Sequence, residues 1–160
     1  MRLKPRVKFA PKIKIPEDFR MIVDTREQKS IFEPEHWIIN KALPVGDFSI
    51  NGFETLITIE RKSTDLYSSL GVDRERFTKE LEKMKDYKWK GLLIQATEPE
   101  IYEEHEFSGL HANSVYHSLA AIETKYGLHI YYAMNIDLAK WWVLSRLTKL
   151  YKYLREGLLI

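Results

Sequence analysis

Two acidic residues and a lysine form the sequence pattern with the clearest chemical meaning. Asp47 follows Gly46, residues 48–59 come next, and the chain continues with Glu60-Arg61-Lys62. Carboxylate oxygens are the ligands that Mg²⁺ and Mn²⁺ prefer. A metal ion held there can lower the pKa of a bound water and offset charge on a phosphate, while Lys62 orients or deprotonates that water or stabilises the pentavalent phosphate. The pattern predicts metal-assisted hydrolysis of a phosphate ester, and the alternative is that Glu60 and Lys62 form the solvated face of a hairpin.

The residues around this pattern predict a β-hairpin that positions it. Residues 47–50 and 56–61 are expected strands, and Asn51-Gly52 between them suits the positive φ angles of a tight turn. The first strand opens with the aspartate and the second closes with the glutamate, so we expect the two carboxylates to converge at the open end of the hairpin. Glu60 and Lys62 are two residues apart on a strand and therefore project from the same face.

A second acidic segment lies earlier in the chain. Residues 20–24 are expected to form a short buried strand that ends in Asp24, and Thr25-Arg26-Glu27 follows it directly. Functional groups commonly follow the carboxyl ends of strands in α/β proteins. Asp24, Arg26 and Glu27 are therefore further candidates for the same site.

The remaining chain predicts an α/β fold with a central mixed sheet flanked by helices. Ser63 or Thr64 is the expected cap of one helix and Asn113 of another. The other expected strands are 36–39, 91–96 and 129–133, and the expected helices are 64–70, 73–87, 113–126 and 137–155.

Together these motifs resemble the nuclease domain of the XPF/Hef family, within the PD-(D/E)XK superfamily. The family signature is Gly-Asp, a variable gap, Glu-Arg-Lys, three residues and Asp. Gly46-Asp47 and Glu60-Arg61-Lys62 match as they stand, and Asp24-Thr25-Arg26-Glu27 looks like the earlier acidic motif of the family. The resemblance implies a restriction-endonuclease-like fold and a Mg²⁺-dependent endonuclease, with Mn²⁺ as a substitute, that hydrolyses phosphodiester bonds of DNA. Branched DNA in repair or recombination is one substrate class that the resemblance implies, and the sequence leaves flap, fork, junction and plain duplex open. The alternative is a non-catalytic DNA-binding or scaffolding subunit of a nuclease complex, against which the intact acids argue.

The resemblance also implies residue roles. Asp47 and Glu60 would be the principal metal ligands, Asp24 a further carboxylate at the metal, and Lys62 the catalytic lysine. Asp65 follows Lys62 after two residues, where the family pattern has three. The supporting or DNA-facing residues at the catalytic site would be Arg26, Glu27, Arg61 and Asp65, and Arg76 and Lys79 would contact DNA.

Composition narrows the class of protein. Residues 1–16 form a basic N-terminal arm without an acidic residue, whereas all 23 acidic residues lie in the expected nuclease domain, residues 17–160. Such an arm can neutralise DNA phosphates, or it is a solvated tail. The absence of cysteine excludes cysteine-ligated zinc, iron–sulfur clusters and a thiol nucleophile. No apolar run is long enough for a membrane span, so we expect an intracellular protein, cytoplasmic or associated with the nucleoid or nucleus, without a membrane partner.

The helix expected over residues 137–155 predicts self-association. Its apolar residues cover more than the single stripe that one sheet face can bury, and the family resemblance also implies paired nuclease domains, so we expect a homodimer. The alternative is that the basic arm or residues 97–110 cover this surface. The helix-hairpin-helix domains of many family members are not expected here, because the chain ends at Ile160. No pattern identifies a recruiting protein or makes a metal ligand of the five histidines at 36, 105, 111, 117 and 129.

Overall fold

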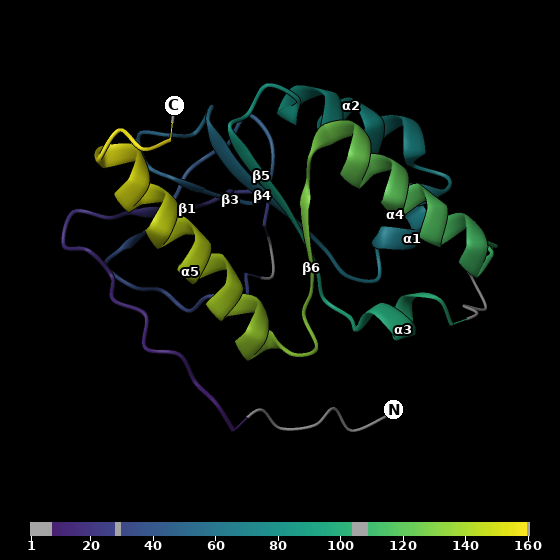
Figure 1. Ribbon diagram of the computed structural model, residues 1–160, viewed down its shortest axis with the longest axis horizontal. Helices are drawn as coiled ribbons and strands as arrows, with labels where there is room; N and C mark the ends of the chain where they lie inside the picture. Colours follow the sequence, from purple (N-terminus) through teal and green to yellow (C-terminus); the bar gives the residue numbers. More distant parts are fainter. Residues whose placement is uncertain (1–7, 28–29, 104–108, 160) are drawn as a thin grey trace.

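A six-stranded mixed sheet with helices on both faces forms the body of the protein (Figure 1). The computed structural model describes residues 8–27, 30–103 and 109–159. The strands are β1 (Met21–Val23), β2 (Ile38–Asn40), β3 (Phe48–Ile50), β4 (Ile57–Lys62), β5 (Trp89–Ile94) and β6 (His129–Tyr132). The helices are α1 (Leu66–Leu70), α2 (Arg74–Met84), α3 (Glu98–Ile101), α4 (Ala112–Tyr126) and α5 (Ile136–Arg155).

Strand order and direction bring the acidic motifs to one edge of the sheet. The order is β2-β1-β3-β4-β5-β6. β3 runs antiparallel to both neighbours, with Val23 opposite Phe48 and Phe48 opposite Ile59, whereas β4, β5 and β6 are parallel. The end of β1, the beginning of β3 and the end of β4 therefore meet, and each of these three places carries one of the predicted acidic motifs.

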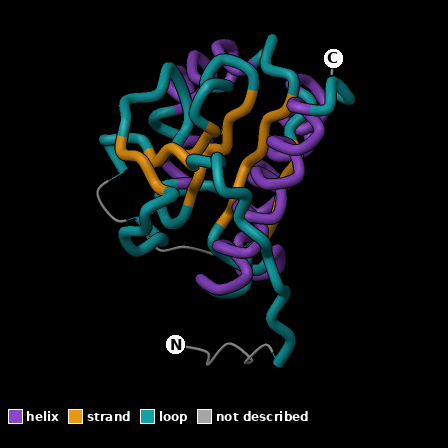
Figure 2. The backbone as a smooth tube through the Cα atoms, turned by 90° about the vertical axis from the view of Figure 1, so that its left-hand side faces the viewer, coloured by secondary structure: helices purple, strands orange, loops and turns teal. Residues whose placement is uncertain are grey.

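The sheet separates two hydrophobic cores. On β5, Leu93 points into a core under α5, while its neighbours Leu92 and Ile94 point into a core under α1, α2 and α4. Adjacent strand residues face opposite sides, so the two cores lie on opposite faces of the sheet, with α5 alone on one of them (Figures 1 and 2). Residues 92–94 therefore belong to a strand that is covered on both faces.

The N-terminal segment runs beside α5 before it enters β1, as Figure 2 shows for its described part. Ile15 packs against the core under α5. Residues 1–7 of the predicted arm lie outside the described residues. None of the helices in the described part of the chain combines the length and apolarity that a membrane span requires.

The predicted fold class is confirmed, and two local expectations are corrected. Ser63 and Thr64 do not cap α1: the Ser63 N–H donates to Asp65 Oδ1 at 2.7 Å, which makes these residues part of a turn, and Asp65 stands at the helix N-cap. Asn113 does not cap α4, because His111 is the extended residue before the helix and Asn113 lies in its first turn. Helix α3, capped by the side chain of Thr97, was not anticipated.

We predict that Gly91→Ala lowers the free energy of unfolding by about 1–3 kcal/mol, the usual cost of overpacking. A Cβ at Gly91 would lie 2.7 Å from Cη2 of Trp142 and 3.0 Å from Trp89. The indole of Trp142 also stacks on Tyr131, with ring centroids 5.3 Å apart, so it has little room to move away. Urea denaturation measures the effect, and an unchanged midpoint would show that α5 sits less tightly on β5 than described.

Candidate active site

A tight approach of two segments fixes Asp47 beside β4. Gly46 has a φ of +85°, and a Cβ there would lie 1.9 Å from Thr58 Oγ1, so only glycine fits. The Asp47 N–H donates to the carbonyl oxygen of Ile59 at 2.8 Å. In return, the Arg61 N–H donates to Asp47 Oδ2 at 2.7 Å. The backbone of β4 thus holds both the main chain and the carboxylate of Asp47.

Glu60 and Lys62 lie on the same face of β4, as predicted. Lys62 Nζ is 3.5 Å from Glu60 Oε1 and 4.8 Å from the ring centroid of Phe77 on α2. Each residue is only 8% exposed. The alternative that the two form a solvated hairpin face is therefore wrong, because α2 covers them.

A cavity of about 210 Å³ gathers acids from four parts of the chain. Asp24, Asp47 and Glu60 line it together with two residues of α2, Glu80 and Lys83. Sequence reasoning missed these two because mixed charge on a helix indicates a solvated face. The available signal was spacing: Glu80 is three residues after Phe77, the residue that contacts Lys62, and so lies on the same side of the helix.

Burial dominates the electrostatics of the two principal acids. It raises the pKa of Asp47 to about 7, although the hydrogen bond from the Arg61 N–H opposes the change. Burial, and after it the charge of Asp47, raises the pKa of Glu60 well above its ordinary value. Two neighbouring buried carboxylates of this kind resist ionising together, so the cavity favours a bound cation.

Asp24 differs from the other two because both its oxygens are engaged. Oδ1 accepts from the Leu43 N–H at 2.8 Å and from Arg26 Nη2 at 3.2 Å, and Oδ2 accepts from Arg26 Nε at 2.8 Å and from the Arg26 N–H at 3.1 Å. Burial alone would raise the pKa of Asp24, but these hydrogen bonds outweigh it and hold the pKa below its usual value. Asp24 is therefore an ionised carboxylate that ties the end of β1 to the loop before Asp47.

Glu27 and Arg61 form a support for the same edge. Arg61 Nη1 lies 2.7 Å from Glu27 Oε1, and Arg61 Nε donates to Gln95 Oε1. Asp65 stands at the start of α1 with Oδ2 3.8 Å from Lys62 Nζ. The structure thus places Asp65 near the site despite the shorter sequence spacing.

The predicted DNA contacts on α2 lie outside the cavity. Arg76 is paired with Asp73 at 3.6 Å and Lys79 with Glu75 at 3.7 Å, and both cations are largely exposed. Of the histidines, His129 stacks on Trp89, and none lines the cavity among those described. His105 lies outside the described residues.

The carboxylates of the cavity fit a divalent cation, although they do not surround a single point as a complete set of ligands. Within residues 8–27, 30–103 and 109–159, no group of three or more His, Cys, Asp or Glu side chains is arranged to hold a metal ion. Asp47 and Glu60 supply hard oxygen donors whose burial is costly without a positive charge. Asp24 and Glu80 face the same cavity, so further carboxylates are at hand.

The fold matches that of the XPF nuclease domains, and a sequence comparison identifies the family of the chain. The family model of the ERCC4 domain matches residues 23–144, and the chain belongs to this family. Among solved structures, XPF from Aeropyrum pernix in complex with DNA matches with a TM-score of 0.61 and 24% identity over 83% of this chain and 64% of that chain. A second structure of XPF from Aeropyrum pernix matches with a TM-score of 0.63 and 23% identity, over 86% of this chain and 69% of that one. No curated protein matches the sequence. The family expected from the motifs is confirmed.

We predict that Asp47→Asn makes the metal-free protein more stable, with a gain that grows as pH rises. Since the pKa of Asp47 is raised from 3.8 to about 7, the native state binds more protons than the unfolded state in this window and loses stability as pH increases. The neutral amide removes this loss and can still accept the Arg61 N–H. Thermal unfolding in EDTA from about pH 5 to about pH 8 measures the gain.

The exposed carboxyl of Asp86 provides the matched control. The melting temperature of Asp86→Asn should differ from that of the parent protein by the same amount at every pH. If the difference for Asp47→Asn is also constant with pH, the buried carboxylate of Asp47 does not destabilise the protein.

Proposed function

We propose that this protein is a metal-dependent DNA endonuclease that hydrolyses phosphodiester bonds. The observation that carries the proposal is the pair of buried carboxylates, Asp47 and Glu60, that share a cavity beside the ammonium group of Lys62. Membership of the ERCC4 domain family supports it. So does the likeness to XPF from Aeropyrum pernix, a protein whose structure is described in complex with DNA.

Mg²⁺ is the proposed cofactor, with Mn²⁺ as a substitute. Asp47 and Glu60 would hold it, with Asp24 as a further carboxylate. When bound, the ion would supply Lewis-acid polarisation of the phosphate and acidify a water.

The protein's own residues would supply the rest of the chemistry. Lys62 is a cation fixed between Glu60 and the ring of Phe77, a position from which it can orient the attacking water or stabilise charge on the phosphate. Asp24 with Arg26, and Glu27 with Arg61, would act as positioning pairs, because their contacts join the strand ends that carry the acids. Branched DNA is the proposed substrate class, with repair or recombination as the setting.

We predict that Asp47→Ala, Glu60→Ala and Lys62→Ala each slow DNA cleavage at least about a hundredfold, the scale of one strong transition-state contact. DNA binding should survive or improve in the two acid variants, because each loses a negative charge near phosphate. The assay incubates labelled branched and linear DNA with Mg²⁺, with Mn²⁺ and with EDTA.

Glu75→Ala is the control for this series, since Glu75 is an acid on α2 that is 90% exposed and lies outside the cavity. It should cleave at the parent rate. Cleavage retained by Glu60→Ala would contradict the metal mechanism, and binding without any cleavage by the parent protein would favour the scaffolding subunit.

We extend the proposal to a homodimer. The N-terminal segment covers part of α5, and the helix keeps 55% of Ile136 and 40% of Tyr153 exposed, with Leu158 beyond it 66% exposed. These apolar side chains remain available to a second copy of the chain.

We predict that light scattering gives about twice the 19.0 kDa chain mass and that Tyr153→Glu reduces it. A charge placed on an exposed ring disturbs the interface without entering the core. A parent protein that stays monomeric at high micromolar concentration would contradict the homodimer.

A further inference from the structure

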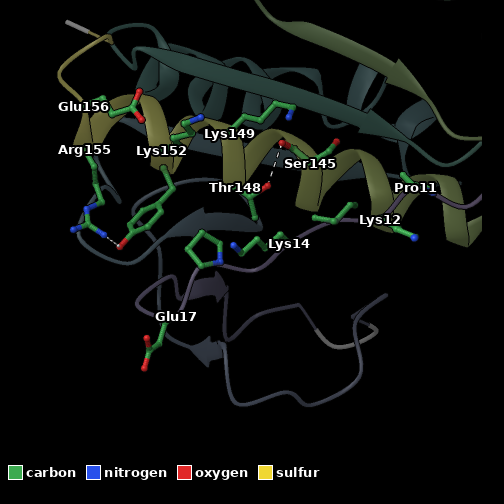
Figure 3. A pocket seen from close by; sticks show the side chains of 13 residues that line it. Pro11, Lys12, Lys14, Glu17, Ser145, Thr148, Lys149, Lys152, Arg155 and Glu156 are labelled. Carbon is green, nitrogen blue, oxygen red and sulfur yellow. Dashed lines mark hydrogen bonds between the residues drawn. The ribbon is translucent and has the colours of Figure 1, made fainter.

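A basic groove lies between the N-terminal segment and α5. It has a volume of about 1120 Å³, and we call it the α5 groove. One wall is the extended segment that contains Lys12 and Lys14, and the other is the carboxyl-terminal half of α5 with Lys149 and Lys152 (Figure 3). All four lysines are exposed.

These four lysines carry charge that no described carboxylate neutralises. Lys41, Lys79 and Lys125 elsewhere on the surface each pair with a glutamate. The four lysines of the groove form no ion pair with any residue in the described ranges. The carboxylates in the lining are those of Glu17 and Glu156, and Arg155 is already paired with Asp18.

The segment that carries one wall is anchored. Ile13 and Ile15 alternate with the two lysines and are half-buried, and Ile15 packs on the core under α5. In an extended chain this alternation turns the lysines outward. The groove therefore carries two lysines on each side.

The two hydroxyl groups of α5 in the groove are bonded to the backbone of their own helix. The hydroxyl of Ser145 donates to the carbonyl oxygen of Trp142 at 3.1 Å, and that of Thr148 donates to Leu144 at 2.7 Å. Because Arg155 is paired with Asp18, the donor side chains of α5 in the groove that have no partner among the described residues are those of Lys149 and Lys152. Recognition through charge alone suits the sugar-phosphate backbone of a nucleic acid, which is bound without regard to sequence.

We propose that the α5 groove binds the phosphate backbone of DNA as a second contact surface, separate from the acidic cavity. The cavity lies on the face of Glu60 and α2, whereas α5 packs on the opposite face of the sheet over Ile59. The groove therefore holds a different stretch of DNA from the one at the cavity. The inference rests on the proposed function, because it takes DNA as the polyanion.

The test measures DNA affinity against salt concentration in EDTA, where binding is separated from cleavage. Fluorescence anisotropy with labelled branched DNA is the readout. Each lost phosphate contact lowers the slope of log K against log salt by about 0.9. The double variant Lys149→Ala/Lys152→Ala should therefore flatten the slope by about 1.8. The four-lysine variant, which adds Lys12→Ala and Lys14→Ala, should flatten it by about 3.6.

Lys85→Ala/Lys88→Ala is the matched control, because it removes two exposed lysines after α2 with the same change in net charge. It should change the slope much less. Equal flattening by the control, or an unchanged slope in the folded four-lysine variant, would overturn the proposal. The proposal would also be overturned if the four-lysine variant kept the DNA slope but lost binding to poly-glutamate, because the groove would then bind an acidic protein.

The outcome is separable from the nuclease proposal. A flattened slope in a protein that never cleaves DNA keeps the groove and rejects the nuclease. Normal metal-dependent cleavage with an unchanged slope keeps the nuclease proposal and rejects the groove. Circular dichroism confirms that each variant is folded.

Discussion

The burial of Asp47 beside Glu60 is the constraint on which the rest of this structure depends. Taking two carboxylates out of water at neighbouring positions costs free energy unless positive charge or donated hydrogen bonds compensate. The surrounding residues supply part of this compensation through the Arg61 N–H and the ammonium of Lys62. Because the pKa of both acids still stands above its ordinary value, the compensation is incomplete, and a divalent cation would complete it.

The fold can be understood as the support for that arrangement. The reversal of direction at β3 joins the ends of three strands at one edge. Gly46 allows the loop to come within contact of Thr58. Asp24 and Arg26 tie that loop to β1, and Glu27 and Arg61 tie β1 to β4. The acids are thus held by backbone hydrogen bonds and ion pairs rather than by mobile surface side chains.

Much of this could be predicted from sequence because strand geometry is local. The alternation on β4 was sufficient to place Glu60 and Lys62 on one face, and the hairpin order brought Asp47 beside them. The expected tight turn at Asn51-Gly52 was wrong in detail, because Gly52 has a φ of +93° but Asn51 has no positive φ, and residues 51–56 join β3 to β4. The spacing of Glu80 from Phe77 places both on one side of α2, but only the packing of α2 over the sheet shows that this side faces the cavity. The engagement of both Asp24 oxygens likewise requires the loop at Leu43, which is distant in sequence.

Calorimetry of Mn²⁺ binding tests the central claim most directly, because it requires neither DNA nor cleavage. Binding should need both Asp47 and Glu60, and it should release protons near pH 7, where Asp47 is partly protonated without metal. Titrations in buffers of different ionisation enthalpy count those protons. We expect release that declines as pH rises above that value, and Asp47→Asn should lose Mn²⁺ binding and the release with it. Absence of Mn²⁺ binding, or binding of equal strength in Asp47→Asn and Glu60→Gln, would contradict the account.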